Sequence, residues 1–144
     1  MTDSLNVFFG FLGGSIMSVE EGYKVLPNHP SERTFTRLAD AKWFLALQWC
    51  EQSLTPAAIL NNTSQFSFQN ELALTLNLNT LIPEAIRAEI FQLALPLTPR
   101  ETKTYTLHLD HDRRLLELQS VEIDPRYGKV ALIRECPPDF APTP

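Results

Sequence analysis

Cysteine is scarce in this chain of 144 residues. Cys50 and Cys136 are the only two, and they lie far apart in the sequence. A disulfide framework or a structural zinc site needs more cysteines than this. The pattern therefore indicates a reduced, intracellular protein, and we expect it in the cytoplasm.

Positive charge is also in short supply. Lys and Arg number 12 against 17 Asp and Glu, which gives a formal net charge of −5. Binding to nucleic acid requires concentrated Lys and Arg, so we expect no nucleic acid partner. The apolar, glycine-containing stretch at residues 5–17 is shorter than the about 20 residues of a membrane-spanning helix. We expect a strand there, and no membrane span.

The common catalytic signatures are missing as well. The chain has no G-x-S-x-G motif, no Walker loop and no G-x-G-x-x-G motif. No pair of carboxylates stands out as a general acid and base. Cys50 is expected among the aromatic residues of a helix, where a thiol behaves as a small hydrophobic group. The sequence thus implies no cofactor and favours a protein that is not an enzyme.

One cluster does contain the residue types of a metal or acid–base site. His108, Asp110, His111 and Asp112 follow closely on one another, and two arginines come next. A metal centre needs three or four convergent ligands, held by further residues that orient the histidines. A strand and a hairpin tip do not supply that convergence by themselves. A solvated hairpin is our interpretation, and a small metal-dependent hydrolase using these four residues is the alternative.

Two helices are predicted, one over residues 31–53 and one from Pro83 to Pro96. The first helix has an apolar stripe of Phe35, Leu38, Leu45 and Trp49, which Lys42 interrupts. Beside that stripe lies a second apolar group made of Trp43, Phe44, Leu47 and Cys50. A surface helix needs one stripe only. This helix is therefore either sandwiched between two layers or exposes a patch to a partner.

Strands are predicted from alternation and turn signals. Residues 66–78 alternate and should form two strands or one bulged strand, with a turn or bulge at Gln69–Glu71. A capping box at Ser18–Glu21 predicts a short helical turn. Further strands are expected over residues 6–12, from about 104 to 109, over 114–123 with a bulge at Gln119–Ser120, and over 129–135 after a turn that ends at Gly128.

These elements together indicate the α+β class. We expect a single domain over residues 1–136 and a flexible, Pro-rich tail over residues 137–144. The domain should hold a mainly antiparallel sheet of five to six strands, with one long and one shorter helix packed on one face. This order of elements is loosely similar to that of bacterial secretion chaperones, although no motif carries the resemblance.

The sequence therefore predicts a non-catalytic protein-binding or assembly protein, such as an adaptor, a chaperone or a small subunit of a complex. Its partner would be another protein or a second copy of the chain in a homodimer, with Trp43, Phe44 and Leu47 at the contact. Besides the metal-dependent hydrolase, a carrier of a small apolar ligand is a second alternative, which the abundance of Phe and Leu permits.

Overall fold

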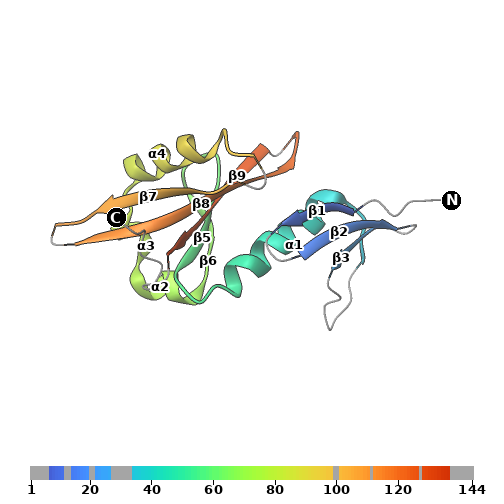
Figure 1. The fold of residues 1–144 in the computed structure, drawn as a ribbon, viewed down its shortest axis with the longest axis horizontal. Coiled ribbons are helices and arrows are strands. Elements are labelled where there is room, and N and C mark those ends of the chain that lie inside the picture. The colour runs from blue at the N-terminus through green and yellow to red at the C-terminus, as the bar shows by residue number, and fades with distance from the viewer. Residues whose placement is uncertain are drawn as a thin grey trace.

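The computed structural model describes the chain in seven stretches and contains two antiparallel sheets joined by a long helix (Figure 1). The α+β class and the mainly antiparallel sheet are confirmed. In the stretches that are described, no helix is both long enough and apolar enough to cross a membrane. The seven described stretches are residues 7–11, 14–19, 22–26, 34–98, 101–110, 112–126 and 128–136. The predicted tail at residues 137–144 lies outside them.

The first sheet has the strand order β1-β2-β3-β4. The first of its strands confirms the strand expected at residues 6–12. Each strand pairs with the next in antiparallel fashion, which is the arrangement of successive hairpins. Their bounds are β1 Val7–Phe11, β2 Gly14–Val19, β3 Gly22–Leu26 and β4 Thr34–Phe35.

The helical turn expected after Ser18–Glu21 is wrong. Ser18 lies in β2 and pairs with Tyr23 of β3. Gly22 opens β3 with a φ of 147°, and a Cβ atom at this position would stand 2.1 Å from the carbonyl oxygen of Phe35. Only glycine fits this close approach. A hairpin between β2 and β3 therefore replaces the capped helix.

The second sheet has the strand order β6-β5-β9-β8-β7. Three of its strands confirm those predicted in the last third of the chain, and Gly128 has the positive φ expected of the turn, at 94°. β5, an interior strand between β6 and β9, was missed because its short apolar run lies between two turn signals. The bounds are β5 Ala57–Leu60, β6 Phe66–Gln69, β7 Lys103–His108, β8 Arg113–Asp124 and β9 Gly128–Glu135.

The long helix, α1 (Leu38–Glu51), is shorter than the predicted span of 31–53. Thr34 and Phe35 pair with β3 instead of starting the helix. Arg37 stands at the N-cap in an extended conformation, and its guanidinium lies 3.3 Å from the Asp40 carboxylate. Residues 31–33 are outside the described part of the chain. The helix therefore begins only after the chain has left the first sheet.

The second half of the predicted strand at 66–78 is helical, so that prediction is wrong from Asn70 onward. Asn70 caps the helix α2 (Glu71–Leu76), because its side chain accepts a hydrogen bond from the Ala73 N–H. The short helix α3 (Leu78–Leu81) follows directly. The helix predicted between Pro83 and Pro96 is confirmed as α4 (Glu84–Ala94).

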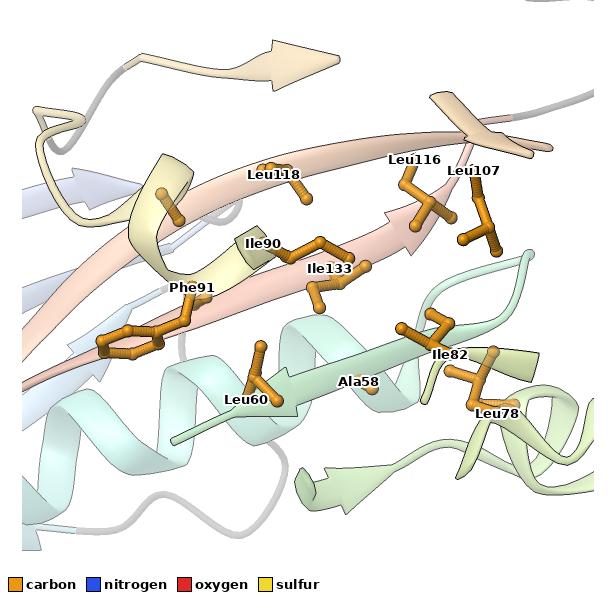
Figure 2. Close-up of a cluster of buried hydrophobic side chains, with 13 residues drawn as sticks. Ala58, Leu60, Leu78, Ile82, Ile90, Phe91, Leu107, Leu116, Leu118 and Ile133 are labelled. Atoms are coloured by element: carbon orange, nitrogen blue, oxygen red, sulfur yellow. The ribbon is translucent and has the colours of Figure 1, made fainter. Parts of the chain in front are cut away.

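The hydrophobic core has two clusters, which lie on opposite faces of the second sheet. Along β5, Ala57 and Ile59 belong to the cluster under α1, whereas Ala58 and Leu60 belong to the cluster under α2, α3 and α4. Figure 2 shows the second cluster, with Ile90 and Phe91 of α4 over the sheet. The helices therefore cover both faces, rather than the single face that the sequence indicated, and β5 is buried from both sides.

The bulge that the sequence predicted at Gln119–Ser120 is wrong. The pairing of β8 with β9 is regular from Leu116 to Glu122, and its only irregularity lies between Glu122 and Asp124. Leu118 faces the α4 cluster, whereas Val121 faces the α1 cluster. The apolar parity of the sequence changes because the covered face of the strand changes along its length.

Candidate functional site

The His108–Asp112 segment joins β7 to β8 as a hairpin. His108 pairs with Arg113, and the Leu109 N–H donates to the Asp112 carbonyl at 2.8 Å. The side chains of His108, Asp110 and Asp112 are exposed, and the Asp112 carboxylate accepts a bond from the Arg113 N–H at 2.7 Å. His111 lies outside the described residues. Within the described ranges, no three His, Cys, Asp or Glu side chains are grouped so that they could hold a metal ion.

The two cysteines are free and buried. Burial raises the pKa of the Cys50 thiol to about 12, above its ordinary value of 9.0, although a hydrogen bond from Asn70 acts in the opposite direction. Burial, followed by the charge of Glu117, also raises the pKa of Cys136. A nucleophilic cysteine needs the opposite shift, because the thiolate is the reactive form. Both thiols are therefore suited to packing in the interior rather than to nucleophilic attack.

Trp43, Phe44 and Leu47, the predicted contact residues, are half-buried and pack against the cluster under α1. The Phe44 ring lies 5.4 Å from the Phe35 ring of β4, measured between centroids. The helix contacts β2, β3 and β4 on one side and β5, β8 and β9 on the other. The sequence left open whether this doubly apolar helix is sandwiched or exposes a patch. In the structure it lies between two layers.

The small residues of α1 are buried more completely than its aromatic ones, in the cluster that the helix shares with the second sheet. Ala41, Ala46 and Cys50 are fully buried. Lys42 is buried beside them, and its ammonium donates to the Glu122 carbonyl of β8 at 3.0 Å. Burial lowers the pKa of this lysine, and the nearby Glu122 and Asp124 oppose that shift. The lysine that interrupts the apolar stripe is therefore a link between the helix and the irregular end of β8.

Among the residues whose side chains the structure describes, the most exposed large apolar ones lie elsewhere, on the loop after α1 and on α2. Leu54 is 93% exposed, Leu74 is 62% exposed and Leu72 is 45% exposed. We call these three residues the leucine surface. Each of these side chains leaves apolar area in contact with water, which a partner could cover.

The loop that carries Leu54 is held by hydrogen bonds on both sides of that residue. Before it, the Ser53 hydroxyl bonds to the Thr55 carbonyl at 2.8 Å and accepts from the Thr55 N–H at 3.2 Å. After it, the Thr55 hydroxyl donates to the Glu135 carbonyl of β9 at 2.6 Å. Ordering this loop on binding would therefore cost little conformational entropy. The loop holds the backbone around Leu54 in place, and the Leu54 side chain faces solvent.

Asn70 connects that loop to α2. Its side-chain amide is buried and donates to the carbonyls of Cys50 and Thr55, at 3.1 and 3.0 Å. Its side-chain oxygen accepts from the N–H groups of Ala57 and Ala73, at 3.1 and 2.9 Å. The side chain thus uses both donors and both lone pairs. It fixes the end of α1, the start of β5 and the first turn of α2 against one another, and Figure 1 shows α2 beside the chain that leaves α1.

An apolar hollow opens on the same side of the sheet as α2. Leu76 and Leu81 line it, together with Pro56, Arg114 and Glu135. Its volume is about 270 Å³ when the solvent at its mouth is included, but its interior has room for only about one water molecule. An apolar ligand of any size would require these walls to move apart.

One wall of the hollow carries an ion pair. The Arg114 guanidinium contacts the Glu135 carboxylate at 2.8 Å, and both side chains are partly shielded from solvent. The Arg114 Nε atom is buried and has no hydrogen-bond partner within the described part of the chain. A water molecule in the hollow is a suitable acceptor for it.

Sequence reasoning missed the leucine surface because Leu72 and Leu74 fitted the alternation of a strand. Asn70 was the available signal, since it broke the parity and is a preferred N-cap residue. No protein-family model matches the chain, and a search of curated proteins also finds no match.

Proposed function

We propose that this protein is a non-catalytic protein-binding or assembly protein that contacts its partner through the leucine surface. The exposure of Leu54, at 93%, on a hydrogen-bonded loop is the observation that carries the proposal. An exposed apolar side chain on an ordered backbone is suited to filling a pocket on a partner, because little backbone freedom is lost on binding.

The chemistry of the remaining side chains supports the same proposal. The buried thiols have raised pKa values, and the exposed carboxylates of Asp110 and Asp112 stand on a hairpin turn. Neither arrangement brings a nucleophile and a base together, as covalent catalysis needs. Binding through Leu54 and α2 requires no such arrangement.

The proposed contact residues differ from those that the sequence suggested. Phe44 and Trp43 pack between the layers of the fold, so replacing them changes stability as well as any surface. Leu54 and Leu72 are more accessible, and serine at these positions is expected to change the free energy of unfolding by less than about 0.5 kcal/mol. They therefore allow binding to be tested separately from folding.

The test is an affinity capture from a lysate of the native host, followed by quantitative mass spectrometry. The tagged wild-type protein is compared with the double variant Leu54→Ser, Leu72→Ser. The matched control is Leu95→Ser, which removes an exposed leucine at the end of α4. A partner recovered in near-stoichiometric amount with the wild type and with Leu95→Ser, and lost with the double variant, is the expected result. Equal recovery with all three proteins would contradict the proposal.

A further inference from the structure

β7 forms one edge of the second sheet and pairs regularly along its whole length. Among the described residues it pairs with β8 alone, over six residues and without a shift of register. The strand contains no proline, and its only Lys, Arg, Asp or Glu residue is Lys103, at its start. Helices α1 and α4 pack mainly on β8 and β9 rather than on β7. A regular, uncovered edge of this kind is a template for pairing with another strand.

The other three edges of the two described sheets are blunted. β4 has two residues and β6 has four. The pairing of β1 with β2 is irregular, and so is the pairing of β6 with β5. Short strands and bulges are means by which proteins prevent an edge from pairing with other chains. β7 has neither of these features, so it is the edge that the described part of the chain leaves open to pairing.

The hydrogen bonds around β7 show which of its backbone groups face outward. In an antiparallel pair, residues that bond to the neighbouring strand alternate with residues whose N–H and C=O groups point away from it. Leu115 pairs with Thr106, yet its carbonyl accepts from the Cys136 N–H at 2.8 Å, on the β9 side. The Leu109 N–H donates to the Asp112 carbonyl in the turn between β7 and β8. Both bonds indicate that the odd-numbered residues of β7 bond to β8, whereas the even-numbered ones direct their backbone groups to the free edge.

The even-numbered residues of β7 are Thr104, Thr106 and His108. Their side chains lie on the opposite face of the sheet from Leu107, which belongs to the cluster under α4. Thr104 and His108 are exposed, and Thr106 is half-buried. None of the three is a Lys, Arg, Asp or Glu. Charge at these positions therefore does not keep a second strand away.

This edge is self-complementary when two copies of the chain meet about a two-fold axis at Thr106. In that antiparallel register Thr106 faces its own copy, and Thr104 faces His108. A pair of threonines that face each other across antiparallel strands is stabilising. On the other face of the sheet, Tyr105 faces Leu107 of the second copy and would gain apolar cover from it.

We propose that two copies of the chain pair through β7, antiparallel and about a two-fold axis at Thr106, so that their five-stranded sheets form one continuous sheet. In this register the two copies of Lys103 stand at opposite ends of the joined strands, which keeps their charges apart. A strand of another protein would meet the same backbone groups, but a second copy meets them with no like charges opposed. This inference goes beyond the proposed function, because the contact does not involve the leucine surface.

The test is the oligomeric state in solution, measured by analytical ultracentrifugation over a series of protein concentrations. We expect the wild type to show a concentration-dependent equilibrium between monomer and dimer. Thr106→Lys and Thr106→Glu each place two like charges at the axis, and each should weaken dimerisation by at least roughly tenfold. An equimolar mixture of these two variants should dimerise again, because opposite charges then meet at the axis.

Three further variants make the result specific. Thr106→Ala is the matched control, because it shortens the side chain without adding a charge, and it should weaken dimerisation only a few-fold. Thr106→Pro removes an outward N–H that β8 does not use, so it should keep the fold and weaken dimerisation by at least roughly tenfold. The double variant Leu54→Ser, Leu72→Ser should dimerise like the wild type. Circular dichroism of each variant shows whether it keeps the wild-type fold, and the charged variants decide the matter if the proline variant unfolds.

Each outcome separates this inference from the proposed function. A wild type that stays monomeric throughout the concentration series overturns the inference. Unchanged dimerisation of both charged variants also overturns it, since the contact then lies elsewhere. Charged variants that stay monomeric when mixed overturn the register at Thr106. Loss of the dimer in the leucine double variant would place the contact on the leucine surface and overturn the inference. In every case the lysate capture still tests the proposed function independently.

Discussion

Asn70 offers the sharpest test of how this fold is held together. Its side chain is 4% exposed and makes four hydrogen bonds, to Cys50, Thr55, Ala57 and Ala73. A hydrogen bond contributes about 1 kcal/mol net to the free energy of unfolding. The substitution Asn70→Ala should therefore lower that free energy by about 4 kcal/mol, which is a large part of the roughly 5–15 kcal/mol of a natural domain.

Asn61→Ala is the matched control for this substitution. The Asn61 side-chain oxygen accepts three hydrogen bonds, from the N–H groups of Thr63 and Gln65 and from the Thr63 hydroxyl. These bonds are at the surface, so water can replace them. We expect this variant to lose less than about 1 kcal/mol. The two variants remove the same side chain from a buried and from an exposed network.

Urea unfolding is the appropriate assay, followed by the fluorescence of the two tryptophans of α1 and by circular dichroism. The two signals should change together, and the dependence on urea concentration should be the same in the three proteins if only stability has changed. If Asn70→Ala lowers the free energy of unfolding no more than Asn61→Ala does, the reasoning is refuted. The hydrogen bonds of the buried amide would then contribute no more than bonds that water can replace.

Three further predictions concern the backbone, a buried thiol and the core. Gly22→Ala should lower the free energy of unfolding by at least about 2 kcal/mol, measured in urea, because the new Cβ would meet the Phe35 carbonyl oxygen; a neutral result would mean that β3 does not approach β4 so closely. Between pH 9 and 12 the unfolded chain loses the Cys50 proton while the folded chain keeps it, so stability should fall with rising pH by up to about 1.4 kcal/mol per pH unit. Cys50→Ala should remove this contribution, and identical pH slopes for the two proteins would contradict it. Leu118→Ala should cost about 2–5 kcal/mol in thermal or urea unfolding, since the side chain is fully buried, and a smaller loss would show that the α4 cluster collapses around the gap.

The sequence was most informative where turn residues stand between apolar segments rich in β-branched residues. The last hairpin is an example, because Asp124, Pro125 and Gly128 fix the turn and the flanking segments carry Val and Ile. It was misleading where one residue decided between two structures. From Phe66 to Leu78 the alternation is compatible with a strand, but the hydrogen bonds of Asn70 start a helix there. Those bonds reach back to Cys50 and Thr55, and no local pattern can show them.

The candidate site was harder to predict than the fold, because it depends on which apolar residues the fold leaves uncovered. The large aromatic residues of α1 stood out in the sequence, yet Trp43 and Phe44 pack between two layers. Leu54 lies in a short polar loop and attracted no attention, although it is the most exposed large apolar side chain of the described residues. Composition shows how much apolar surface a chain has, but tertiary packing decides where that surface remains accessible.

The two-sided sheet has a consequence for how the protein loses its structure. β5, β8 and β9 each give alternate side chains to both clusters, so one set of backbones lies inside two separate hydrophobic layers. Melting either layer exposes one side of the strands that support the other. The pair of clusters should therefore behave as a single cooperative unit, and the amides of β9 should exchange with solvent only when the whole sheet opens.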